Sequence, residues 1–287
     1  MADTFYYSRD TKVHLTDSAG AIYKIPVLDG FSFSQATNTS EITLNEMATS
    51  AGVSRRARQM FTDSYAPAEW SMSTYIRPFK SGGAGSGGEH AAVAHHIVEE
   101  ALWNALAGSG AVGATGTALT ADGTDANIAF TNSNKVALDT FTLEFEMGSG
   151  KSNPTIYKIT DCVVNEVSID FDIDGIATAN WSGFGSIITE ESSMSTATIF
   201  EGTAAADTNN FIRNRLTDLT VTASAAGSIT TAYTLTLTGG NITISNNMSY
   251  LTPETLGIIN QPLGHVTGTR SVTGNFTCYL NTPASGN

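Results

Sequence analysis

The chain has 287 residues, enough to bury a full hydrophobic core without disulfides or metals. Only 14% of the residues are charged, and 14 Lys and Arg stand against 27 Asp and Glu, for a net charge of −13. This charge argues against binding to nucleic acid phosphates, and the 41% hydrophobic content argues against disorder. The abundance of Thr, Ser and Gly favours strands and turns over helices.

Targeting signals and cysteine motifs are both missing from the sequence. No apolar run approaches the roughly 20 residues of a membrane span, and the first residues form neither the basic nor the apolar region of a signal peptide. Cys162 and Cys278 fit no zinc motif and make no disulfide framework. We expect both to be buried, reduced side chains.

The N-terminal third alternates between predicted strands and turns. Lys12–Leu15 and Ala21–Leu28 are expected to form a hairpin, followed by a strand at Phe31–Ser34. Residues 45–68 lose periodicity and read as a long loop. The next strand, Trp70–Arg77, places Trp70, Met72, Thr74 and Ile76 on one side.

The middle of the chain holds the one predicted helix. A Gly-rich connector at residues 81–88 leads into residues 89–107, where apolar side chains recur at four-residue steps and Gly108 follows the end. Such a helix would pack one face on a sheet. Residues 108–135 are rich in Gly, Ala, Thr and Asn and are interpreted as a surface insertion in a single domain that spans residues 1–287.

Residues 136–280 form a succession of alternating segments that predicts a mainly β protein, an antiparallel sandwich or barrel with one flanking helix. A hairpin theme recurs three times, each time as an apolar/polar alternating strand and then a strand that opens with a small–aromatic–small step. The three units pair Phe31–Ser34 with Glu69–Ser71, Val167–Ile173 with Asn180–Ser182, and Ile242–Ser249 with Gly274–Phe276.

Several motifs resemble catalytic or ligand sites but lack essential parts. Gly148–Ser152 resembles the end of a phosphate-binding loop, but Phe145 stands where the motif needs Gly and a strand follows, so we predict a hairpin turn. The pairs His95/Glu99 and His96/Glu100 have helical spacing, but two ligands make no zinc site. No catalytic constellation, cofactor motif or metal motif is evident, so we expect neither enzymatic activity nor a cofactor.

The acidic charge is concentrated in residues 139–201, which carry eleven acids against Lys151 and Lys158. Carboxylates at alternate positions of a strand share one face and stay ionised only in water. Calcium binding is an alternative, because Gly175 is sixth from Asp170, but Trp181 is twelfth where a calcium loop has Glu. A solvated acidic face with no specific role is another. The acids that we predict on wet strand faces are Asp170, Asp172, Asp174, Glu144 and Glu146.

Residues 161–185, DCVVNEVSIDFDIDGIATANWSGFG, resemble the core hairpin of tail tube (major tail) proteins of long-tailed bacteriophages. Residues 25–35, IPVLDGFSFSQ, resemble the opening strands of that family, and residues 269–280, TRSVTGNFTCYL, resemble its closing strand. The resemblance covers about half of the chain; residues 81–135 go beyond the family's minimal core.

The resemblance implies a β-sandwich whose six-subunit rings stack head to tail into a hollow tube. The five acids would face the lumen, so that DNA passes through without specific binding, and Arg55, Arg56 and Arg58 would contact neighbouring subunits or rings. Implied partners are other copies of the chain, the tape-measure, baseplate and tail-terminator proteins, and as a further candidate a sheath protein, but no membrane. The implied location is the virion tail, after assembly in the host cytoplasm. The alternatives are an inner tube protein of a contractile injection system, a non-enzymatic decoration or adhesin module, and a β-rich hydrolase.

Overall fold

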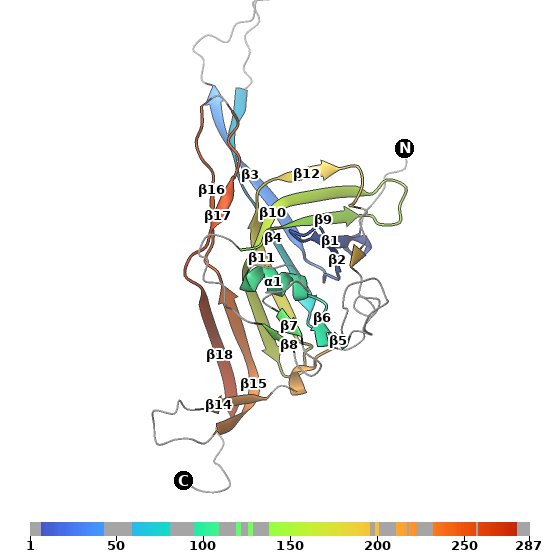
Figure 1. Cartoon of the computed structure of the whole chain (residues 1–287), viewed down its shortest axis with the longest axis vertical. Helices are drawn as coiled ribbons and strands as arrows, with labels where there is room; N and C mark the ends of the chain where they lie inside the picture. Colours follow the sequence, from blue (N-terminus) through green and yellow to red (C-terminus); the bar gives the residue numbers. More distant parts are fainter. Residues whose placement is uncertain are drawn as a thin grey trace, which may run out of the picture.

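Strands dominate the computed structural model of the chain (Figure 1). The described residues are 7–42, 59–80, 95–108, 119–121, 126–128, 138–195, 199–200, 211–216, 218–222, 232–256 and 258–279. Within them lie one α-helix, α1 (Glu100–Ala107), and two short 3-10 turns, η1 (Ser8–Asp10) and η2 (Asn214–Leu216). The predicted fold class, a mainly β sandwich-like fold with one helix, is confirmed.

One layer contains six strands, hereafter the six-stranded layer. Every neighbouring pair in it is antiparallel, and β18 and β3 each have a single partner among the described strands. The order across the layer is β3 (Ser32–Ile42), β4 (Gln59–Tyr75), β11 (Thr178–Gly185), β10 (Thr155–Asp172), β15 (Ala232–Ser245) and β18 (Ser271–Tyr279).

This layer is built from the three predicted hairpins. β3 pairs with β4, β10 with β11, and β15 with β18, and the three hairpins lie side by side through the β4–β11 and β10–β15 pairs. The recurring sequence theme therefore predicted the three hairpins, and the structure joins them into one surface.

A second layer packs behind β3, β4, β11 and β10. It consists of β13 (Ile199–Phe200), β2 (Ile22–Ile25), β1 (Lys12–Thr16), β9 (Phe141–Met147), the N-terminal half of β10, and β12 (Ile188–Glu191). β10 serves both layers because a bulge between Ile159 and Cys162, with Asp161 at φ 51°, turns its direction.

The remaining strands are short. Six of them form three separate two-stranded sheets, and the seventh, β14, pairs with β15. They are β5 (Pro78–Lys80) with β6 (His95–Ile97), β7 (Leu119–Ala121) with β8 (Ala126–Ile128), β16 (Ser249–Leu251) with β17 (Gly264–Val266), and β14 (Leu219–Thr222) against β15.

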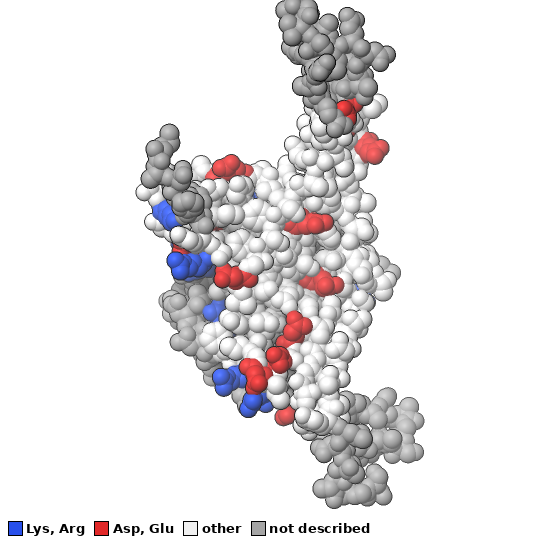
Figure 2. All heavy atoms as spheres, turned by 180° about the vertical axis from the view of Figure 1, so that it is seen from behind, with Lys and Arg blue, Asp and Glu red and all other residues white. Residues whose placement is uncertain are grey.

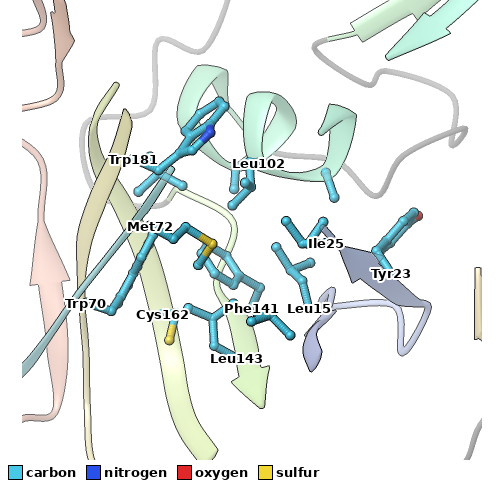
Figure 3. Close-up of a cluster of buried hydrophobic side chains, with 14 of the residues drawn as sticks. Leu15, Tyr23, Ile25, Trp70, Met72, Leu102, Phe141, Leu143, Cys162 and Trp181 are labelled. Atoms are coloured by element: carbon cyan, nitrogen blue, oxygen red, sulfur yellow. The ribbon is translucent and has the colours of Figure 1, made fainter. Parts of the chain in front are cut away.

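The core lies between the layers and under α1 (Figure 3). Trp181 is 1% exposed. Its indole packs edge-on against Trp103 of α1, with 5.0 Å between the ring centroids, and donates a hydrogen bond to Thr74.

Trp70 and Met72 are buried on the same side of β4, as their alternation predicted. At the end of α1, Arg270 donates to the carbonyls of Leu106 and Ala107, which fixes the helix to the start of β18.

Several predicted elements differ from the structure. The helix begins at Glu100, not at residue 89, because His95–Ile97 pair as a strand with β5, and all eight helix residues are buried instead of one face. The predicted loop 45–68 is already strand from Gln59, because backbone pairing with β3 compensates for the missing apolar pattern. The 81–88 connector lies outside the described residues, as do most residues of the 108–135 insertion.

Two turns and both cysteines can also be compared with the predictions from the sequence. The β1–β2 turn is confirmed: Asp17 accepts hydrogen bonds from the amides of Ala19 and Ala21. Gly148–Ser152 is a turn between β9 and β10, with Gly148 and Gly150 at positive φ. Cys162 is buried as predicted, but Cys278 is exposed, and the hydrophobic core formed by the described residues includes no side chain of β18.

Candidate assembly surface

The side of the six-stranded layer that faces away from α1 is polar. Strand register aligns its side chains in rows that cross the layer, because residues two apart on a strand share a side. One row contains Ser271, Ser245, Glu166, Ser182, Ser71 and Ser32; the next contains Thr273, Thr243, Ser168, Asn180 and Ser73; a third contains Asn275, Asn241, Asp170, Thr178 and Tyr75. We call these three rows the polar side.

Asp170 is at the centre of a hydrogen-bond network on the polar side. Its two carboxylate oxygens accept hydrogen bonds from Asn180 Nδ2 at 2.9 Å and from Asn241 Nδ2 at 2.5 Å. Asn180 Oδ1 in turn accepts from the Ser73 hydroxyl, and Asn241 also donates to Ser168. The network spans β4, β11, β10 and β15, so the acid is held in place while it stays exposed to water.

Asn180 and Asn241 are functional candidates that the sequence reasoning missed. Along its strand, each alternates with residues whose side chains are apolar or absent, which is the same pattern that identified Asp170. Strand alternation alone would have placed them on the wet side; their pairing with Asp170 depends on which strands become neighbours, and the alternation does not contain that information.

The other two aspartates of the predicted acidic run have different surroundings. Asp172 is exposed at the end of β10, opposite Gly239, and continues the polar side. Asp174 lies beyond the strand in the turn and forms an exposed ion pair with Arg215 at 2.5 Å. Its charge is therefore paired locally, which weakens its contribution to a shared acidic face.

Glu144 and Glu146 belong to the second layer and do not share the polar side. Glu144 is only 1% exposed; it accepts hydrogen bonds from the amide of Ser195 at 3.0 Å and from its hydroxyl at 2.6 Å. Glu146 forms an ion pair with Lys12 at 3.7 Å. The prediction of a wet face for Glu144 was wrong, because the carboxylate is buried and its oxygens accept hydrogen bonds from Ser195.

Within the described residues, the hydroxyl of the serine beside Glu144 bonds to that carboxylate and not to a histidine. The Ser195 hydroxyl donates to Glu144, and the register neighbour of Glu144 is His14, whose pKa is lowered by burial against the opposing effect of Glu144. A serine nucleophile needs its hydroxyl bonded to a base that accepts the proton and then releases it to the leaving group, the role of histidine in the known triads.

Other predicted candidates do not form a site among the described residues. Arg55, Arg56 and Arg58 lie outside them. Glu99 and Glu100 are buried at the start of α1, whereas His95 and His96 lie in β6, so the predicted pairs do not share a helix face. The described residues contain no group of three or more His, Cys, Asp or Glu side chains placed to hold a metal ion. No helix in the described part of the chain is long and apolar enough to cross a membrane.

Figure 2 shows the molecule from the polar side. Asp and Glu side chains are spread along its length, and the Lys and Arg side chains lie toward one edge. The polar rows themselves carry hydroxyl, amide and carboxylate groups, with neither Lys nor Arg. The three rows are therefore polar, and their charged groups, Glu166 and Asp170, are acidic.

The family model of the phage tail tube protein matches residues 28–284. The chain is 30% identical over 277 residues to the tail tube protein pb6 of Escherichia phage T5. The aligned region covers 92% of this chain and 54% of pb6, so the chain spans about half the length of that relative.

Two solved structures match at 9% and 8% identity with TM-scores of 0.37 and 0.38, each over 67% of this chain and nearly all of the other. They are a sheath/tube terminator of an extracellular contractile injection system and the tube-terminating cap of the anti-feeding prophage. The family match spans most of the sequence, and the chain belongs to the phage tail tube protein family, whose role is structural and non-enzymatic.

Proposed function

We propose that copies of this chain close into six-membered rings, that the rings stack into a hollow tube, and that the polar side borders a lumen through which DNA passes. The observation that carries the proposal is a polar surface six strands wide that ends in two edge strands, β3 and β18, each with one partner among the described strands. The tube would form in the host cytoplasm and contact the other tail components in the virion.

Strand direction supports ring closure. Six antiparallel strands are an even number, so β3 and β18 run in opposite directions. The β3 strand of a second copy can therefore join β18 with antiparallel pairing, and the polar side stays on the same side at every such junction. Closed rings remove the edges that otherwise promote uncontrolled aggregation.

Charge supports passage of DNA. Asp170 and Asp172 project on the polar side, and Glu166 adds a half-buried carboxylate. Duplex DNA carries about one negative charge per 1.7 Å of its axis. A lumen of the same sign keeps the phosphates hydrated and prevents adhesion, and the neutral Ser, Thr and Asn groups keep the wall wet.

The test combines microscopy of the purified protein with a charge reversal. We expect rings or tubes with a central channel, and we expect Asp170→Lys with Asp172→Lys to assemble but to slow DNA ejection from virions. Glu190→Lys with Glu191→Lys is the matched control, because both acids are exposed on β12 in the second layer. Equal ejection rates in both double variants would remove the electrostatic argument, and only dispersed monomers for the unmodified protein would overturn the proposed function.

A further inference from the structure

The third hairpin, β15–β18, exposes its apolar side. Val272 is 66% exposed and Phe276 is 39% exposed, and Cys278 lies on the same side. Ile242 and Ile244 of β15 are half-buried beside them. We call these five residues the open face.

In the other two hairpins, the second layer covers the apolar side. Phe33 of β3 packs on Phe145 and Tyr157 of the second layer, at 4.7 and 5.3 Å between ring centroids. In the second hairpin Val167 is fully buried. The second layer packs behind these two hairpins and its core extends to Ile244 of β15, whereas Val272, Phe276 and Cys278 of β18 lie beyond that core. Within the described part of the chain, β18 therefore has the alternation of a covered strand without a cover.

The open face lacks the charges and prolines that protect a solvent edge, and the one bulge of the β15–β18 pair, between Leu237 and Gly239, lies toward the Cys278 end of the pair. The Phe276 ring lies against the backbone of Gly240, where a Cβ would come within 2.8 Å of the ring. β15 and β18 together contain no Asp, Glu, Lys, Arg or Pro. Natural edge strands that remain in water are protected by charges, proline or bulges that keep other chains away. β18 has the composition of a strand that is paired in the functional state.

We propose that the open face docks on a second copy of this chain, with β18 beside β3 of that copy and the copy's second layer over Val272 and Phe276. The inference rests on the proposed function and adds the surface that closes the ring. The direction of β3 fits, and Tyr157 shows that the second layer reaches the β3 edge. Both surfaces carry apolar groups, namely Val272 and Phe276 on the open face and the half-buried Phe33 at the β3 edge. Removing both from water would drive the association.

The reactivity of the Cys278 thiol reports directly whether the open face is covered. It is one of two cysteines, and the other, Cys162, is fully buried, where burial raises the pKa of its thiol. A maleimide should modify Cys278 rapidly in dilute monomer and at least about tenfold more slowly in assembled rings, because thiol modification requires access. The matched control is Thr277→Cys with Cys278→Ser, which moves the thiol to the polar side of the same strand and should remain reactive after assembly.

Each outcome decides the proposal. Assembled rings that leave Cys278 as reactive as in the monomer would overturn the docking surface and leave the proposed function intact. Protection already present in dilute monomer would mean that a segment of the same chain covers the face, which also overturns it. Failure of the unmodified protein to assemble would overturn the proposed function, and the docking surface with it.

A pair of substitutions provides a second readout. Val272→Glu with Phe276→Glu should give a folded monomer, with an unchanged circular dichroism spectrum and a reactive Cys278, that forms no rings. Thr273→Glu lies on the opposite side of β18 and should assemble. Rings formed by the Val272/Phe276 variant at the concentration that suffices for the Thr273 variant would contradict the proposal.

Discussion

The hairpins β10–β11 and β15–β18 are neighbours in one layer and have the same alternation, yet their apolar sides have opposite environments. Val167, Ile244 and Val272 occupy one cross-strand row. Val167 is fully buried, whereas Val272, two strands away, is 66% exposed. Alternation determines which side of the sheet a residue occupies, and the layer behind it determines whether that side is buried. In a protein that assembles, an uncovered apolar side indicates where a partner docks.

The largest expected effect is at Gly183, in the covered hairpin. A Cβ at this position would lie 2.0 Å from the Val163 carbonyl oxygen and 2.5 Å from Trp70 Cζ2, so Gly183→Ala must displace backbone and indole together. We expect a loss of more than about 4 kcal/mol in the free energy of unfolding, or failure to fold. Urea denaturation followed by tryptophan fluorescence measures the loss.

Gly264 of β17 is the control for this substitution. A Cβ there meets no atom within 4 Å. Gly264→Ala should therefore change stability by less than about 0.5 kcal/mol. Equal losses at the two glycines would show that close packing around Gly183 is not the cause of its loss.

A buried carboxylate directly before α1 makes the stability of the fold depend on pH. Burial raises the pKa of Glu99 from 4.5 to about 7, although Arg77 lies 3.9 Å away. Because the folded state favours the neutral acid, its stabilising contribution is complete below pH 4.5 and is lost as the pH rises through 7. The shift corresponds to a contribution on the order of 3 kcal/mol.

Glu99→Gln should abolish this part of the pH dependence, since the amide stays neutral. Thermal unfolding between pH 4.5 and 8 would then show a flatter stability curve than that of the unmodified chain, with the variant more stable at pH 8. Glu190→Gln on the exposed strand β12 is the matched control and should leave the curve unchanged. A wild-type curve that is already flat through this range would contradict the assignment.

Much of the local structure was predictable because local chemistry determines it. The alternation of β9 and β10, the Asp17 turn and the glycines at 148 and 150 all follow from residues within a few positions of each other. The three hairpins were also recognisable, because each one contains its own alternation. The polar character of one side was therefore accessible from the sequence.

What could not be predicted depends on contacts between distant segments. Glu144 and Asp170 have the same alternating context, yet Ser195 covers Glu144, and asparagines of two other strands hold Asp170 in water. The helix was predicted too long because apolar spacing does not reveal that residues 95–97 pair with β5. In each case the decisive neighbour lies far along the chain, where periodicity carries no information.

The smallest effect, and the closest comparison, comes from two valines in the same row. Val167→Ala removes two buried methyl groups, and we expect a loss of about 2 kcal/mol from transfer and cavity terms together. Val272→Ala removes the same atoms from a site already in water, and the stability of the monomer should change by less than about 0.5 kcal/mol. Urea denaturation of dilute monomer measures both. Under assembling conditions the order changes, because Val272→Ala should raise the concentration at which rings appear if a second copy covers it. A Val272→Ala monomer destabilised as much as Val167→Ala would mean that the open face is already covered within its own chain.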